Sequence, residues 1–578
     1  MLARLRKTNI SEYLIWFLIY FALSLIIYHG IVLNGLGYSI PNNAWGNGDW
    51  GLSSFMMAWT PYSIIHHVNP FYSNNEFALH GINMMATPAY FTQAFIMSPV
   101  TELFGTIVSL NLAIILAPIV CALPAAIVFY KITSYKFGSV VGGLFAGFGR
   151  GLISGNVSAH LNLSWIFAPP IIIYIFYNIL RKKDADLIKS GVALGIVMTL
   201  QFYASTEVLV DTLYVCLAAG VVVLFVNARI IKERFFKLLG TLFIGGFISG
   251  VACIYAVYVF LYGHAHVFVE RQMWDSVLNY NLLFVFFPRN VAHNGIQIFG
   301  DRFCAITLPV FAVAILIVRI NKTIKDQTAK VAFFMFIILF LVMFGPLLQG
   351  WAQGPLQPNP VYYVVRHLPF VYAVLYRRFV YYDELFLGLS IVYVLKSFKM
   401  NKHSKANFTS RWFNARIVVT AFILLNLLWN SAYVWNVQTS FQPNPVLSSK
   451  TYLPENGIIW VYPRISFNSG LSAAYLAQSG LRYKVVSVYA NLIFDGQNSI
   501  MLPPSALRSY IDASTKPGVL PQADIINNVK GYVASSKISC IVIYNASQYK
   551  SRVNKVSYIY GSPKIIQNTD VWCHLKGN

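Results

Sequence analysis

Charged residues are scarce in this chain of 578 residues: Asp, Glu, Lys and Arg make up only 11% of it, whereas 57% of the residues are hydrophobic. Soluble domains carry about a quarter of their residues as charged side chains, so the scarcity excludes an ordinary soluble enzyme and a disordered chain. Acids are the scarcer sign, with 20 Asp and Glu against 43 Lys and Arg. Basic nucleic-acid-binding proteins are not this apolar, and we expect no nucleic-acid partner.

Cysteines and nucleotide-binding motifs are also scarce. The chain has six cysteines and no Cys/His spacing typical of a zinc site, and residues 446–578 contain no G-x-G-x-x-G or P-loop. Cys540 and Cys573 fall in two predicted strands near the C-terminus, where a disulfide is one alternative and two free thiols are the other. Because those motifs are absent from residues 446–578, we expect that part of the chain to bind no nucleotide.

Long apolar runs are what the chain has in abundance. They predict an α-helical polytopic membrane protein with about 11 transmembrane helices, the first of which is a retained anchor rather than a cleaved signal peptide. The runs lie near residues 13–33, 106–130, 137–153, 161–180, 190–204, 206–227, 238–262, 303–318, 331–348, 379–395 and 417–437.

The positive charges predict which way the protein faces. Lys and Arg are absent between Thr8 and Tyr130, and threading the runs from a cytoplasmic N-terminus places 23 of the 43 cations on the inner face. This asymmetry predicts a multi-pass plasma-membrane protein with a cytoplasmic N-terminus and, because the number of runs is odd, an extracytoplasmic C-terminal part. The long outer loops would then be residues 34–105, 263–302 and 349–378, and we expect the chemistry on that face.

The composition changes near residue 446. Residues 1–445 form the predicted multi-span domain, and residues 446–578 alternate strand and helix patterns, which predicts a small extracytoplasmic α/β domain. The expected elements are strands at 458–462, 483–489 and 538–544, helices at 469–478, 523–535 and near 547–558, and a hairpin at 564–575.

The first outer loop holds the best candidate for a catalytic group. Asp49 is a single acid among glycines and tryptophans, and an acid near an apolar mouth suits a general base that takes a proton from a sugar hydroxyl. The neighbouring Trp50 offers an aromatic face of the kind that stacks on sugars. The alternative is that Asp49 caps a helix that begins at Trp50.

The seven cations expected at the outer face are all arginines, whereas the 23 inner cations comprise 15 Lys and 8 Arg. Guanidinium groups grip phosphate bidentately and stay charged near lipid, which suits a lipid-phosphate donor. Arg289, Arg377 and Arg378 are the best candidates for donor-phosphate binding. The alternative is that they reach lipid headgroups or pair with acids such as Asp383 and Glu384.

Two acids and a histidine near the outer ends of predicted spans are candidates for acceptor or sugar binding. Glu207 and Asp211 share one helix face, and carboxylates within a membrane usually have a function. They either orient an acceptor hydroxyl, hold a metal, pair with Arg150 or support a bundle contact. His160 is a weaker candidate, and its alternative is a neutral histidine hydrogen-bonded in a turn.

Two further motifs are interpreted as structural. Asp184-Ala185-Asp186 has the D-x-D spacing of metal-dependent nucleotide-sugar enzymes, but it lies among cations in a short inner loop and is expected to be a solvated, salt-bridged turn. Gly143, Gly147 and Gly151 recur every four residues in one predicted span, which favours close helix packing.

The order of short motifs along the chain resembles bacterial integral-membrane glycosyltransferases of the GT-C type, in particular the branch with a long C-terminal exoplasmic domain. The matching pieces include Gly48-Asp49, Asn69-Pro70-Phe71, Leu79-His80-Gly81-Ile82-Asn83, Ser158-Ala159-His160-Leu161-Asn162-Leu163, Phe287-Pro288-Arg289, Leu368-Pro369-Phe370 and Arg377-Arg378-Phe379.

The resemblance implies a polyprenyl-phosphate-linked sugar donor and a catalytic acid in the first outer loop, a role that falls on Asp49. Many of these enzymes carry a second acid close to the first, where this chain has Asn47 and Gly51. We therefore assign no cofactor and no metal ligand, and leave a divalent metal as an open alternative.

Together these observations predict a membrane glycosyltransferase, of inverting type, that moves a sugar from a polyprenyl-phosphate donor to a cell-envelope glycan or glycolipid acceptor. Its expected partners are that donor, that acceptor and membrane lipids. The alternative is a transporter or flippase of lipid-linked glycans. Transporters commonly show internal repeats and midplane charges, and neither pattern is found here.

Overall fold

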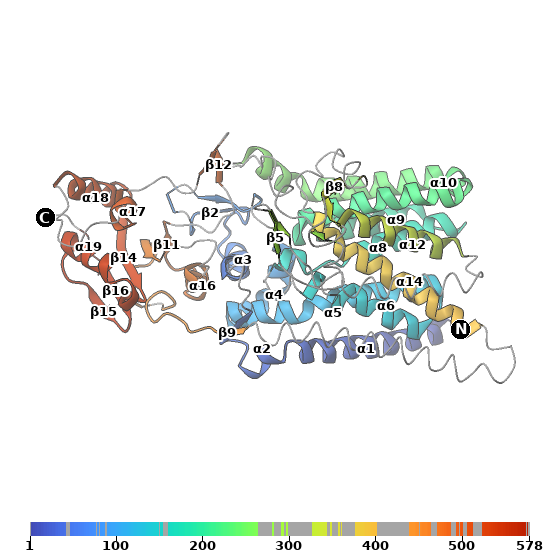
Figure 1. The fold of residues 1–578 in the computed structure, drawn as a ribbon, viewed down its shortest axis with the longest axis horizontal. Helices are drawn as coiled ribbons and strands as arrows, with labels where there is room; N and C mark the ends of the chain where they lie inside the picture. Colours follow the sequence, from blue (N-terminus) through green and yellow to red (C-terminus); the bar gives the residue numbers. More distant parts are fainter. Residues whose placement is uncertain are drawn as a thin grey trace.

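The structure is a computed structural model, and every structural statement below concerns the residues it describes. These are 2–41, 47–76, 78–79, 81–86, 90–149, 151–153, 160–263, 280–281, 291–293, 296–298, 326–343, 347–349, 356–358, 360, 376–400, 438–449, 451–463, 471–486, 493–495, 498–500, 506–512, 523–573 and 575. A bundle of long helices fills one side of the molecule and a five-stranded sheet lies at the other (Figure 1). We call the two ends of the bundle the sheet end and the N-terminal end.

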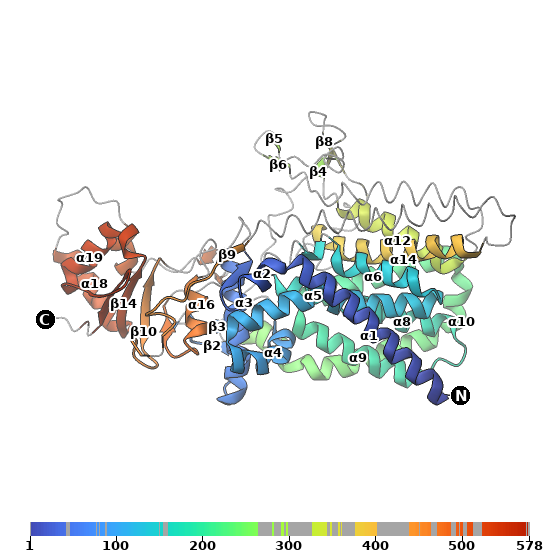
Figure 2. The same ribbon diagram turned by 90° about the horizontal axis from the view of Figure 1, so that it is seen from below.

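Five stretches of the described chain are long and apolar enough to cross a membrane, and the long helices run side by side (Figure 2). The chain is therefore a membrane protein. The bundle contains α1 (Leu2–Ile27), α5 (Thr106–Thr133), α6 (Lys136–Phe148), α8 (Ala168–Arg181), α9 (Leu187–Ala204), α10 (Thr206–Tyr262), α12 (Gln327–Met343) and α14 (Val380–Met400). Nine of the eleven predicted runs coincide with these helices. The runs at 303–318 and 417–437 lie outside the described residues, so the count of eleven stays a prediction.

Helix α10 consists of two antiparallel halves. Its backbone leaves the helical conformation at Asn227, with φ −162° and ψ 78°. Beyond this kink, Lys237 Nζ donates to the Lys183 carbonyl at the N-terminal end of the bundle (2.9 Å). Further along, the Val259 carbonyl accepts from the Asn83 amide near the sheet end (2.7 Å). The two halves match the two spans predicted on either side of Asn227.

Glycines allow α6 to pack directly on α5. A Cβ atom at Gly147 would collide with the Pro118 carbonyl oxygen and with Ala122, and one at Gly143 would collide with the Tyr20 hydroxyl. Both positions therefore require the absence of a side chain, and the close packing predicted from the glycine spacing is confirmed for these two residues.

Replacing Gly147 by valine is expected to destabilise the protein by about 3 kcal/mol or more, because the added methyls overpack a contact made with backbone. Thermal unfolding and the monodisperse yield of the detergent-solubilised protein measure this. Gly220→Val is the matched control, since a Cβ atom at Gly220 meets nothing within 4 Å. Equal losses in the two variants would contradict the packing role of Gly147.

The sheet has the strand order β11-β10-β14-β16-β15. Strand β10 pairs in parallel with β11 and β14, and β16 pairs antiparallel with β14 and β15. The elements are β10 (Ile458–Tyr462), β11 (Lys484–Val485), β14 (Ile538–Tyr544), β15 (Lys564–Ile566), β16 (Thr569–Cys573), α16 (Leu471–Gln478), α17 (Ala506–Asp512), α18 (Ala523–Ser535), η8 (Ala546–Gln548) and α19 (Lys550–Tyr560). These agree with the predicted elements, except that α17 was not predicted and that β11 covers only 484–485 of the strand expected at 483–489, of which residues 487–489 lie outside the described structure. The domain boundary at 446 stays a prediction.

The two faces of the sheet belong to different cores. One face carries Val461, Val542 and Tyr544 into the apolar core that continues into the helix bundle. The other face carries Ile541 and Trp572 into a separate core beneath the helices α17, α18 and α19. The sheet is thus packed against the bundle by a continuous apolar interior.

Several shorter elements complete the described chain. They are α2 (His29–Leu33), β1 (Ser39–Pro41), α3 (Asn47–Ile65), β2 (Tyr72–Ser73), β3 (Ile82–Asn83), α4 (Phe91–Phe104), η1 (Leu161–Leu163), η5 (Tyr376–Phe379) and β9 (Gln438–Ser440). Strand β1 pairs antiparallel with β9. Short strands also occur as β4 (Tyr280–Asn281), β5 (Val291–His293), β6 (Ile296–Ile298), β7 (Leu347–Gln349), β8 (Leu356–Pro358), β12 (Ile493–Asp495) and β13 (Asn498–Ile500).

A disulfide joins Cys540 of β14 to Cys573 of β16, which face each other in the antiparallel register. Replacing both cysteines by serine is expected to destabilise the sheet by about 3 to 4 kcal/mol, the loop-closure value for this separation of 33 residues. Protease resistance of the intact membrane protein during heating measures this. The free cysteine Cys121 gives the control, because Cys121→Ala leaves the bond intact. Unchanged resistance in the double variant would contradict a stabilising bond.

Candidate functional site

An ion pair joins two candidate residues from separate parts of the chain at the sheet end of the bundle. Glu207 lies in the first turn of α10, and Arg378 lies in η5, directly before α14. The Arg378 guanidinium contacts the Glu207 carboxylate, and each side chain is 24% exposed. The pair is therefore partly shielded from water but still accessible.

Tyr382 fastens the start of α14 to the start of α10. Its hydroxyl donates to the Val208 carbonyl (2.7 Å) and lies 3.0 Å from the Thr212 hydroxyl. Tyr382 is 1% exposed. Val208 directly follows Glu207, and Tyr382 lies one turn after Arg378. The hydrogen bond between Tyr382 and Val208 therefore keeps Glu207 and Arg378 close together.

Three more carboxylates are buried at this end. Asp211 is 1% exposed, Asp383 is fully buried, and Glu384 accepts a hydrogen bond from the Gly151 backbone N–H (3.1 Å). Within the described part of the chain, Asp211 Oδ1 and both carboxylate oxygens of Asp383 have no hydrogen-bond partner. Burying such groups in a membrane protein costs several kcal/mol, so their concentration makes this end the candidate site.

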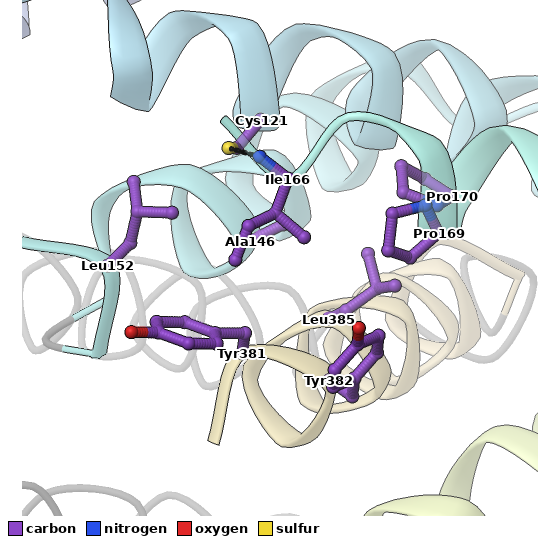
Figure 3. Close-up of a pocket in the computed structure, with 9 residues that line it drawn as sticks. All are labelled: Cys121, Ala146, Leu152, Ile166, Pro169, Pro170, Tyr381, Tyr382 and Leu385. Atoms are coloured by element: carbon purple, nitrogen blue, oxygen red, sulfur yellow. Dashed lines mark hydrogen bonds between the residues drawn. The ribbon is translucent and has the colours of Figure 1, made fainter. Parts of the chain in front are cut away.

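An apolar pocket lies beside the ion pair, between α5, α6, α8 and α14 (Figure 3). The cavity itself is small, about 10 Å³, which is room for about one water molecule. The lining residues are Cys121, Ala146, Leu152, Ile166, Pro169, Pro170, Tyr381, Tyr382 and Leu385. Because Tyr381 and Tyr382 come one turn after Arg378, the pocket adjoins the end of α14 that carries the guanidinium.

Asp49 belongs to the first turn of α3. The helix begins at Asn47 and not at Trp50. Asp49 therefore lies inside the helix, whereas the alternative role as a cap requires a residue directly before the helix. A carboxylate in the first turn is also favourable toward the helix dipole. Only the backbone of Asp49 falls within the described structure, and its role as a base stays a prediction.

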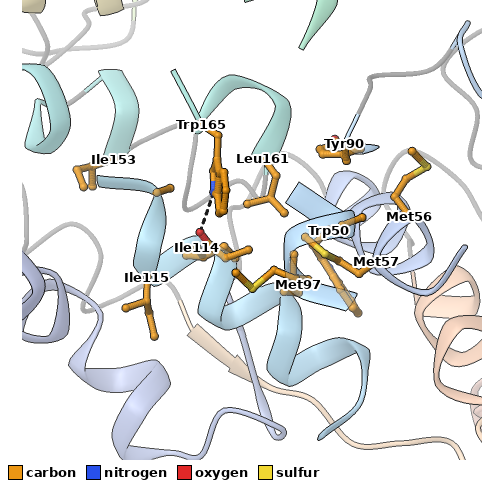
Figure 4. Packing of buried hydrophobic residues seen from close by; sticks show 14 of the residues in the cluster. Trp50, Met56, Met57, Tyr90, Met97, Ile114, Ile115, Ile153, Leu161 and Trp165 are labelled. Carbon is orange, nitrogen blue, oxygen red and sulfur yellow. Dashed lines mark hydrogen bonds between the residues drawn. The ribbon is translucent and has the colours of Figure 1, made fainter. Parts of the chain in front are cut away.

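Trp50 is buried in the apolar core, where it is 1% exposed and packs edge-on against Phe441 (ring centroids 5.6 Å apart). Figure 4 shows it among other members of the same core cluster, including Met57 and Met97. Protein covers the ring, so in this structure Trp50 fixes α3 and does not offer an open face to a sugar.

His160 lies directly before η1, and its backbone carbonyl accepts from the Ser164 hydroxyl (2.9 Å). The next aromatic residue, Trp165, donates its indole N–H to the Ala113 carbonyl (3.1 Å). The turn that carries His160 is therefore built into the bundle. These hydrogen bonds do not test the prediction that His160 contacts an acceptor.

The remaining candidates fall outside the described structure. Arg289 is not described, and only the backbone of Arg377 is. Arg150, one expected partner of Glu207, is not described either.

Sequence reasoning did not single out Tyr382 or Thr212, and it treated Asp383 only as a partner for arginine. The run Tyr381-Tyr382-Asp383-Glu384 at the start of a predicted span was the available signal. Polar side chains at the start of an apolar run are unusual, but a sequence does not show that they face α10.

The D-x-D-like motif lies at the opposite, N-terminal end of the bundle. Asp186 caps α9 by accepting from the Lys189 backbone N–H (3.1 Å), and it pairs with Lys189 Nζ (3.3 Å). The backbone hydrogen bond, followed by the side chain of Lys189, lowers the pKa of the Asp186 carboxyl. The prediction of a salt-bridged turn is confirmed. In the described residues, no group of three or more His, Cys, Asp or Glu is placed to hold a metal ion.

Comparison with known proteins reveals similarity in structure alone. No protein-family model and no curated protein matches the sequence. The oligosaccharyltransferase of Archaeoglobus fulgidus in its apo form aligns with a TM-score of 0.55 and 11% identity, over 94% of this chain and 71% of that one.

Two further solved structures are similar. AglB from Archaeoglobus fulgidus, in complex with an inhibitory peptide and a dolichol-phosphate, aligns with a TM-score of 0.51 and 10% identity, over 95% of this chain and 71% of that one. ArnT from Cupriavidus metallidurans in the apo state aligns at 0.47 and 11% identity, over 97% and 99% of the two chains. The fold of this chain is therefore the GT-C fold.

Proposed function

We propose that this protein is a membrane glycosyltransferase that transfers a sugar from a polyprenyl-phosphate donor to a cell-envelope glycan or glycolipid acceptor. The observation that carries the proposal is the pairing of Arg378 with Glu207 beside an apolar pocket, at one end of a GT-C fold. A cation next to an apolar pocket matches the two halves of such a donor, which are a phosphate and a hydrocarbon chain. The dolichol-phosphate bound to the similar archaeal AglB supports this choice of donor.

Arg378 would bind the donor phosphate. A guanidinium has five N–H donors, so it can contact a carboxylate and phosphate oxygens at the same time. Glu207 then orients the guanidinium. As the sugar leaves, negative charge develops on the phosphate, and a positioned cation stabilises that charge. Arg289 and Arg377 are proposed as further ligands of the same phosphate.

The apolar side chains around the pocket would lie against the part of the hydrocarbon chain nearest the phosphate, since the cavity itself is too small to enclose that chain. The pocket walls include Leu152, Ile166 and Leu385, and they carry no charged side chain. Holding both the chain and the phosphate leaves the anomeric carbon little freedom, and this restriction is a large part of what an enzyme contributes to a two-substrate reaction.

Asp49 would act as the base of an inverting displacement. The acceptor oxygen attacks the anomeric carbon, the bond from that carbon to the phosphate oxygen breaks, and the acceptor proton passes to the Asp49 carboxylate. Helix α3, which carries Asp49, lies at the sheet end of the bundle (Figure 1), and Arg378 contacts Glu207 at the start of α10, at the same end. His160 and Asp211 are kept as candidates for acceptor or sugar binding, whereas the buried Trp50 is not.

The sheet end would face outward. Cations gather at the opposite end, where Lys136 pairs with Glu12 and Arg229 pairs with Glu233. Such clusters favour the cytoplasmic side. The Cys540–Cys573 disulfide supports the same orientation, because disulfides persist in oxidising compartments.

Deleting the gene from its host tests the proposal. Cells without the protein are expected to accumulate a polyprenyl-phosphate-linked sugar and to lose one sugar from an envelope glycan or glycolipid. Mass spectrometry of extracted lipids and glycans measures both, and the wild-type gene restores both. Unchanged glycans and unchanged lipid-linked sugar would contradict the proposed function.

A further inference from the structure

A chain of aromatic rings runs from the first turn of α3 into the sheet. Trp50 contacts Phe441 (ring centroids 5.6 Å apart), Phe441 contacts Tyr475 of α16 (5.7 Å), and Tyr475 contacts Tyr544 of β14 (5.8 Å). All four rings are at most 7% exposed. Ring contacts of this kind have a defined geometry and add about 1 kcal/mol each beyond the area they bury.

Phe441 is also fixed by its backbone. Its N–H donates to the Tyr38 carbonyl (2.6 Å), which extends the pairing of β1 with β9. The strand before α3 and the first turn of α3 are therefore both attached to the short segment 438–441. Phe441 is the residue common to the two attachments.

A third attachment follows α3. The Asn75 side-chain amide donates to the Leu481 carbonyl (2.9 Å), and the Val485 N–H donates to the Asn75 carbonyl (2.8 Å). The Ala78 N–H in turn donates to the Val485 carbonyl (2.9 Å). The first loop thus extends the edge of the sheet beside β11, and α3 is held to the sheet on both sides.

We propose that Phe441 is a positioning residue for Asp49, and this inference rests on the proposed function. The contact of the Trp50 ring with Phe441 fixes the rotation of the first turn of α3 about the helix axis. Because Asp49 directly precedes Trp50, the same contact fixes the position of Asp49. The sheet is then part of the catalytic unit, because it fixes where the base stands relative to the donor. It is not merely an appended binding module.

Phe441→Ala is expected to lower kcat about 100-fold, the scale for displacing a catalytic group by about 1 Å. The Kd for polyprenyl phosphate should stay unchanged, since Arg378 and the apolar pocket are not touched. Phe441→Leu, which keeps most of the volume, should recover most of kcat. Hydrogen exchange of the backbone amides in the first two turns of α3 should accelerate in Phe441→Ala and return toward wild type in Phe441→Leu.

Leu507→Ala is the matched control. Leu507 is fully buried in the core on the other face of the sheet, away from α3. This variant should lower the melting temperature of the sheet as Phe441→Ala does, with kcat and the exchange of α3 unchanged. Equal losses of kcat in the two variants, or a normal kcat in Phe441→Ala despite faster exchange, would overturn the positioning role.

The proposed function fails separately from this inference. If the wild-type protein transfers no sugar, the proposed function and the positioning of a catalytic Asp49 by Phe441 are both overturned. The exchange data then still report whether Phe441 fixes α3. If wild type transfers sugar and only the predicted difference between the two variants is missing, the inference alone is overturned.

Discussion

Replacing Asp49 by asparagine is expected to lower the rate of sugar transfer by about 10²- to 10⁴-fold, the range attributed to a positioned general base. Asparagine has nearly the same shape but cannot accept the acceptor proton at neutral pH. The Kd for the polyprenyl-phosphate donor should not change, because Asp49 acts on the acceptor. Steady-state transfer in proteoliposomes, with donor binding measured separately, tests both statements.

Asp184→Asn serves as the control for this variant. It makes the same chemical change in the charged turn at the N-terminal end of the bundle, and we expect full activity from it. Asp49→Asn should also reach normal abundance in the membrane. Transfer at more than about a tenth of the wild-type rate in Asp49→Asn would remove Asp49 from the role of base.

Replacing Arg378 by methionine is expected to lower transfer by about 10²- to 10³-fold, as the loss of one donor to a developing oxyanion does. It should also weaken donor binding, since a phosphate contact is lost. Arg378→Lys should recover only part of the activity, because an ammonium cannot make the bidentate contact. Transfer rates and the Kd for polyprenyl phosphate measure these effects.

The Arg378→Met change also leaves Glu207 without the cation it contacts, so a structural effect has to be separated from a catalytic one. The double variant Arg378→Met/Glu207→Gln removes the stranded charge. If Arg378 binds phosphate, the double variant stays inactive although its thermal stability recovers. Recovery of activity together with stability would show that the pair is only structural.

Local patterns in the sequence were sufficient for much of the fold. The apolar, β-branched run from Ile538 to Tyr544 predicted β14, and the helical period from Ala523 to Ser535 predicted α18 with the observed bounds. Both elements are long and strongly patterned. The kinked α10 was also predictable, because its charged turn separates two apolar runs.

The arrangement of the candidate site was less predictable, because it depends on contacts between segments far apart in the chain. Glu207 and Arg378 were each selected as candidates, but nothing local indicates that they pair with each other. The glycine-rich sequence around Trp50 suggests an exposed loop. In the structure, Phe441, from a distant part of the chain, packs against the Trp50 ring.

The central claim is that the protein breaks the bond between a sugar and polyprenyl phosphate. The most direct test uses purified protein in proteoliposomes and a donor labelled separately on the sugar and on the polyprenyl chain. The proposed function predicts that free polyprenyl phosphate and a glycosylated acceptor form in equal amounts. A donor that stays intact, or that merely moves to the other leaflet, would contradict the claim, and movement alone would identify a transporter.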